Sequence, residues 1–193
     1  MFVRLLRTLL FLALGSSLLP AAVLAQADFQ VDFEIEKPEN VLAIKWEELM
    51  SQADLAAILN APEVSHEGFG WEEQLNEGSP EEMAFSKALH SFDVNPELLG
   101  KRILLPGFVV PTAYNEDRLV TEFFLVPFFG ACIHVPPPPP NQIIYITYEA
   151  GLRLDNMSEA YYVVGELNGQ VVRHDLADSA YRMEAEQIEI YTY

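Results

Sequence analysis

The chain has 193 residues, a formal net charge of −18 and a single cysteine. So much negative charge repels nucleic acid and anionic membranes, which bind basic surfaces, and it leaves two readings: attraction of cations or basic partners, or solubility alone. One cysteine excludes an intramolecular disulfide. In an oxidising compartment that thiol must be buried, metal-bound, reactive or paired between chains.

Residues 1–27 have the three parts of a secretory signal peptide. Arg4 and Arg7 form the positive segment, residues 9–19 are apolar, and small residues around position 25 suit signal peptidase. The apolar run is shorter than the ~20 residues of a membrane span, so an N-terminal anchor is the weaker alternative. The only thiol, Cys132, is far from the cleavage point, which excludes a lipoprotein. We therefore predict a periplasmic protein with no stable membrane insertion after cleavage.

Residues 28–98 are predicted to form an acidic, helical N-terminal segment. Apolar residues recur at helical spacing between residues 41 and 60, and a loop rich in Gly, Pro and Glu follows over 61–78. The next helix begins at an N-cap, Ser79, with Pro80 in its first position and Glu82 completing a capping box. Asn95-Pro96 ends this segment.

Residues 99–193 change to the two-residue period of strands. The predicted strands are Arg102–Val110, Val120–Val126, Gln142–Tyr148, Tyr161–Leu167 and Gln187–Tyr193. Pro106-Gly107 indicates a bulge or bend in the first of them.

Two further local predictions concern the C-terminal third. Asn168-Gly169 is a strong hairpin signal, so a type I′ turn should pair Gln170–His174 back onto the preceding strand. Asp178–Glu186 is predicted as a short helix. The fold class is therefore α+β but mainly β: a small, partly open OB-like barrel of five to six strands with an N-terminal helical extension.

The most unusual stretch joins the second and third predicted strands. After Pro127-Phe128-Phe129 come Cys132, His134, and a run of five prolines followed by two amides: Pro136, Pro137, Pro138, Pro139, Pro140, Asn141 and Gln142. Prolines cannot donate to a sheet, so the run should leave it as a polyproline II rod of ~15 Å. Such a rod is either a rigid connector or a site for a partner protein. The neighbouring phenylalanines are either core residues or part of a binding surface.

Cys132 and His134 are the candidate metal ligands. In an extended backbone residues two apart point the same way, and a thiolate beside an imidazole supplies half of a zinc site. Two alternatives remain open: a buried structural cysteine, and a catalytic thiol activated by His134 with Asn141 as orienting group. No phosphate-binding loop or G-x-S-x-G nucleophile motif is present in the sequence.

Two strings, LPGFVVP ending at Pro111 and FFLVPFFGACIHVPPPPPNQ ending at Gln142, resemble a family of bacterial exported proteins known only as a domain of unknown function. The resemblance implies a periplasmic location. Because some members are encoded beside zinc-regulated ABC transporters, it also implies a role in zinc supply.

Three functions follow as hypotheses. The first is a periplasmic accessory protein in zinc uptake or homeostasis, which binds the metal or an ABC transporter through the loop that carries Cys132 and His134. The second is a non-enzymatic interaction module that docks an envelope protein and keeps Cys132 for structure. The third is a thiol-dependent enzyme.

Overall fold

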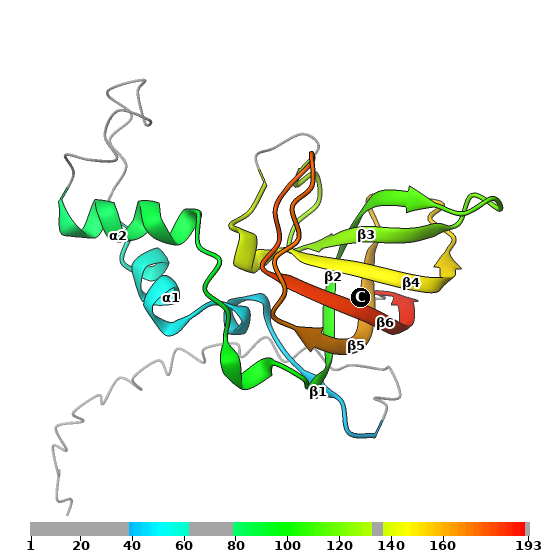
Figure 1. Cartoon of the computed structure of the whole chain (residues 1–193), viewed down its shortest axis with the longest axis horizontal. Coiled ribbons are helices and arrows are strands. Elements are labelled where there is room, and N and C mark those ends of the chain that lie inside the picture. Colours follow the sequence, from blue (N-terminus) through cyan, green and yellow to red (C-terminus); the bar gives the residue numbers. More distant parts are fainter. Residues whose placement is uncertain (1–38, 62–78, 133–136, 192–193) are drawn as a thin grey trace, which may run out of the picture. The chain divides into compact units, whose positions relative to one another are not determined.

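The computed structural model describes residues 39–61, 79–132 and 137–191, all of which belong to one compact unit. The predicted signal peptide, residues 62–78 of the predicted loop and His134 lie outside the described residues. Figure 1 shows the helices α1 (Gln52–Leu59) and α2 (Pro80–Leu89) and the strands β1 to β6. The strands are Leu42–Ala43, Arg102–Tyr114, Val120–Val126, Ile144–Leu152, Ala160–Asn168 and Tyr181–Ile190.

Strands β2 to β6 form a closed mixed barrel. The order in the sheet is β1-β2-β3-β4-β6-β5, and β2 also pairs with β5. The long β2 makes both contacts: Arg102–Phe108 pairs with β5, and Phe108–Tyr114 pairs with β3. The neighbours β4 and β6 run parallel, and all other barrel pairs are antiparallel. The predicted small α+β barrel is therefore confirmed.

Strand β3 has both faces buried. Phe123 and Leu125 point into the barrel core, whereas Phe124 and Val126 point outward into a second apolar cluster. We call this the outer cluster; its buried members are Val110, Phe124, Val126, Ala131, Ile143 and Ala177. Ala131 and Ile143 come from the connection between β3 and β4, and Ala177 comes from the connection between β5 and β6. Both connections therefore cover the outside of the barrel.

The helical segment is fixed to the barrel by polar contacts as well as apolar ones. The Trp46 indole donates to the Pro106 carbonyl at 2.7 Å, and the buried Tyr181 hydroxyl donates to the Leu49 carbonyl at 2.6 Å. Helix α2 begins as predicted, because the Ser79 hydroxyl accepts from the Glu82 amide and the Glu82 carboxylate accepts from the Ser79 amide. Thus a local cap starts the helix, whereas distant partners hold the segment in place.

The predicted hairpin turn at Asn168-Gly169 is wrong. Neither residue has a positive φ, which a type I′ turn requires at both positions, and β5 pairs instead with β6. Residues 169–180 make a longer excursion that is closed by a bridge between Val172 and Ser179. Tertiary contacts override the local signal, because Ala177 on this excursion is buried in the outer cluster.

The predicted helix over Asp178–Glu186 is also wrong. Strand β6 begins at Tyr181, six residues before the predicted strand start. Tyr181, Met183 and Ala185 are buried, and the residues between them point outward, which is the two-residue alternation of a half-buried strand.

No bulge occurs at Pro106-Gly107, where β2 pairs with β5 in unbroken register; the irregularities lie between Pro111 and Tyr114. Gly107 has a packing role instead. A Cβ there would meet the Trp46 ring at 2.9 Å and the Leu125 side chain at 2.8 Å.

Candidate functional site

The proline run ends in a buried, hydrogen-bonded turn. Pro139 keeps polyproline-like angles (φ −51°, ψ 146°), but Pro140 already belongs to the 3-10 helix η4 (Pro140–Gln142). The predicted polyproline II rod therefore does not include the last of the five prolines, Pro140. Pro137 is exposed and Pro138 is buried, whereas Pro136 lies outside the described residues.

Asn141 and Gln142 attach this turn to the helical segment. The Asn141 amide nitrogen donates to the Asp54 carboxylate at 3.0 Å and to the Asp93 carbonyl at 3.1 Å. The Gln142 amide nitrogen donates to the Trp46 carbonyl at 2.8 Å. Both side chains are buried, so in this structure their amide groups hold the loop rather than face solvent. Their predicted role in binding a partner stays a prediction.

Asp54 is the centre of this buried polar group. It is 4% exposed, and its carboxylate accepts from the Ser91 hydroxyl at 2.7 Å as well as from Asn141. Both donors reach the same carboxylate oxygen, Oδ2, and hydrogen-bond this buried polar group as burial requires. The sequence reasoning missed Asp54 and Ser91, although an acid at helical spacing from Met50 and Ala57 was a weak signal for a buried carboxylate.

Cys132 lies at the other end of the loop, beside the outer cluster. Burial raises the pKa of its thiol to about 11, so the thiol is protonated at neutral pH. Its φ is 64°, which is a left-handed conformation and not the extended one assumed for a Cys132–His134 pair. The structure thus shows a neutral, partly buried thiol.

His134 lies outside the described residues, so the structure does not give its position relative to Cys132. Within the part of the chain that the structure describes, no group of three or more His, Cys, Asp or Glu side chains is arranged to hold a metal ion. A zinc site would therefore need His134, or other residues outside the described ranges, beside Cys132.

Phe128 and Phe129 differ in burial from the other two phenylalanines of this stretch. Phe123 and Phe124 are fully buried, whereas Phe128 and Phe129 are 43% and 54% exposed. The Phe129 ring contacts the ring of Phe108 with centroids 6.1 Å apart. Two exposed aromatic side chains therefore lie close in sequence to Cys132, which packs against the outer cluster. We call Phe128 and Phe129 the aromatic pair.

A second connection braces the same region. The backbone amide of Ala180 donates to the Pro140 carbonyl at 2.8 Å. The Arg173 guanidinium lies 4.3 Å from the centroid of the Phe92 ring, and the His174 ring stands edge-on to Phe124 at 5.5 Å. The excursion between β5 and β6 thus contacts the proline turn, the helical segment and the outer cluster together.

Comparisons with known proteins point to one family. The family model described as "Protein of unknown function (DUF3299)" matches residues 46–190. A crystal structure of a DUF3299 family protein from Pseudomonas aeruginosa shares 32% sequence identity, with a TM-score of 0.58 over 79% of this chain and 97% of that one. No curated protein sequence matches the chain. Among the described residues, no helix is long and apolar enough to cross a membrane.

Proposed function

The chain belongs to the DUF3299 family, and we propose that this member is a non-enzymatic binding protein of the bacterial cell envelope. Its binding site is the connection between β3 and β4, and its partner is another envelope protein such as an ABC transporter component. The observation that carries the proposal is the exposed aromatic pair, Phe128 and Phe129, held next to a loop whose far end is buried.

The chemistry of the aromatic pair suits protein recognition. Aromatic side chains bury a large area at small entropic cost and are enriched where proteins bind one another. The loop is already ordered at its C-terminal end by Asn141 and Gln142, so less conformational entropy is lost on binding. The thiol of Cys132 is neutral, which weighs against a thiolate nucleophile and favours a structural cysteine.

The test is site-specific photo-crosslinking in the periplasm of the bacterium that encodes the chain. A photo-reactive residue replaces Phe129 in one variant and, as a control, the 76% exposed Leu59 in another. We expect one discrete adduct with an envelope protein from position 129, lost when Phe128→Ala is added and absent from position 59. No adduct at position 129, or the same adduct from both positions, contradicts the proposal.

Zinc binding by Cys132 and His134 is a second candidate, favoured by the left-handed backbone at Cys132. A non-glycine residue rarely adopts that conformation, and such strain concentrates at functional sites. Zinc must displace the thiol proton, so binding should release a proton and weaken as pH falls. Calorimetric titration of wild type, Cys132→Ser and His134→Ala should show one equivalent for wild type only. Equal binding by all three would place zinc on the acidic surface instead.

Export completes the proposal. If residues 1–27 are cleaved as a signal peptide, the intact mass of the periplasmic protein corresponds to an N-terminus at Gln26 or Asp28. Recovery of the full-length chain in the membrane fraction contradicts it.

A further inference from the structure

Strands β4 and β6 are paired along only the first part of their length. These parallel neighbours pair from Ile144 with Tyr181 to Thr147 with Glu184, and no described pairing joins them beyond that point. Yet β4 continues to Leu152 and β6 to Ile190. Among the described strands, the facing edges of residues 148–152 and 185–190 therefore have no partner. Such edges accept an extended peptide as an added strand.

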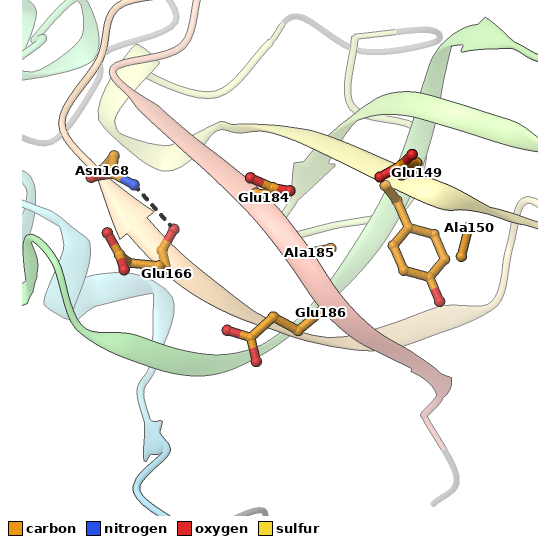
Figure 2. A pocket seen from close by; sticks show the side chains of 8 residues that line it. Glu149, Ala150, Glu166, Asn168, Glu184, Ala185 and Glu186 are labelled. Atoms are coloured by element: carbon orange, nitrogen blue, oxygen red, sulfur yellow. Dashed lines mark hydrogen bonds between the residues drawn. The ribbon is translucent and has the colours of Figure 1, made fainter.

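A hollow of about 730 Å³ lies where the strands part. Figure 2 shows the side chains around it, contributed by β4, β5 and β6. They are Tyr148, Glu149, Ala150, Glu166, Asn168, Glu184, Ala185 and Glu186. We call this hollow and its two unpaired edges the β4–β6 cleft. Four of its eight lining residues are glutamates, and none is a lysine or arginine.

The charges of the cleft are only partly compensated. Glu186 pairs with Arg102, with Nη2 and Oε2 2.5 Å apart, but no ion pair involving Glu149, Glu166 or Glu184 occurs among the described residues. Glu166 and Glu184 are exposed and lie directly opposite each other in the β5–β6 pairing, an arrangement of like charges that destabilises a sheet.

Two nearby cations do not cancel this repulsion. Arg102 lies opposite Glu166 in the β2–β5 pairing, but it forms its ion pair with Glu186. Arg182 precedes Glu184 by two residues on β6 and lies opposite Asn168, with no described ion pair to either glutamate. The cleft thus combines open strand edges with negative charge that a cationic ligand would neutralise.

We propose that the β4–β6 cleft binds an extended, basic segment of a partner protein, which adds as a strand where β4 and β6 part. Residues two apart on a strand share a face, so lysines at alternate positions of that segment match Glu184 and Glu186 on β6. The open edges supply the backbone hydrogen bonds, and the glutamates select the positive charge. No residue of the connection between β3 and β4 lines the cleft, so this site is independent of the aromatic pair.

The experiment uses residues 28–193 and a fluorescent peptide of four Lys-Thr repeats, titrated at low and physiological salt. The test variant is Glu166→Gln/Glu184→Gln. The matched control is Glu97→Gln/Glu116→Gln, which removes the same charge from two exposed acids outside the cleft. We expect about fivefold weaker binding or more for the test variant and a change under about twofold for the control. Amide chemical shifts should move at residues 148–152 and 185–190.

A second peptide separates strand addition from simple charge attraction. Methylation of alternate backbone nitrogens keeps every lysine but removes strand hydrogen bonds, so this peptide should bind at least about fivefold more weakly. The proposal is overturned if the control variant loses as much affinity as the test variant, or if the methylated peptide binds as well as the parent. Absence of binding by wild type at low salt overturns it too.

Discussion

The outside of the barrel is covered on one side and open on the other. Over β2 and β3 the outward side chains Val110, Phe124 and Val126 are buried under the two long connections. Near the end of β5 and in the middle of β6 the outward side chains Glu166, Glu184 and Glu186 are exposed. The same barrel therefore presents a second apolar core on one side and a charged surface on the other.

The sequences of β3 and β6 account for this difference in burial. Strand β3 reads VTEFFLV, a nearly continuous apolar run, and it is buried on both faces. Strand β6 reads YRMEAEQIEI and alternates, so only one face is buried along its first half. A strand's pattern thus indicates whether its outer face will be covered, although it does not say by which segment.

The largest expected effect tests the covered side. Phe124→Ala removes a fully buried ring from the outer cluster and should lower the free energy of unfolding by about 3–5 kcal/mol. The matched control Phe128→Ala removes a ring that is 43% exposed and should cost about 1 kcal/mol or less. Urea denaturation measures both; equal losses would show that the outer cluster is not a core.

The next effect concerns the thiol on the same covered side. Because burial raises the pKa of Cys132 from 9.0 to about 11, the native thiol should react with iodoacetamide at pH 8 about 100-fold more slowly than in urea. The native rate should rise about tenfold per pH unit up to that pKa. An equal rate in native and unfolded protein would show that the thiol is not shielded.

The same shift predicts how stability depends on pH. A thiol whose pKa is higher in the folded state stabilises the fold below its unfolded value, and that contribution is lost as pH rises from about 9 to about 11. The variant Cys132→Ser should lack this part of the alkaline decline. If its decline matches that of wild type, other groups are responsible.

A smaller effect tests what fastens the covering loop. Asn141→Ala removes two donors from the buried polar group, one of them to the Asp54 carboxylate, and should cost about 1–3 kcal/mol of stability. Asn168→Ala, an exposed amide on the open side, should change stability by about 0.5 kcal/mol or less. Similar midpoints for the two variants would show that Asn141 does not hold the loop.

The smallest effect lies on the open side and has the opposite sign. Glu184→Gln removes the like-charge pair with Glu166, so it should stabilise the fold by about 0.2–1 kcal/mol. The gain should shrink in high salt, because these exposed carboxylates are screened. A loss of stability would mean that Glu184 has a favourable partner in the folded chain.

The sequence by itself determined the features that depend on neighbours in the chain. The Ser79 cap with Glu82 starts α2 where predicted, because both partners lie within one turn. The apolar run Val120–Val126 is β3 with the predicted bounds, and the class of small barrel follows from the number and length of such strands. Cys132 and the proline run were likewise visible as the unusual loop.

The tertiary structure alone decided everything that depends on distant partners. Asn168-Gly169 carries a strong local turn signal, yet the chain continues past it because Ala177 gains burial in the outer cluster and Tyr181 reaches the Leu49 carbonyl. Asn141 and Asp54 are 87 residues apart in the sequence, and Glu166 and Glu184 lie opposite each other on the neighbouring strands β5 and β6. A local pattern specifies dihedral preference and periodicity, whereas the energy of these contacts exists only once the barrel closes.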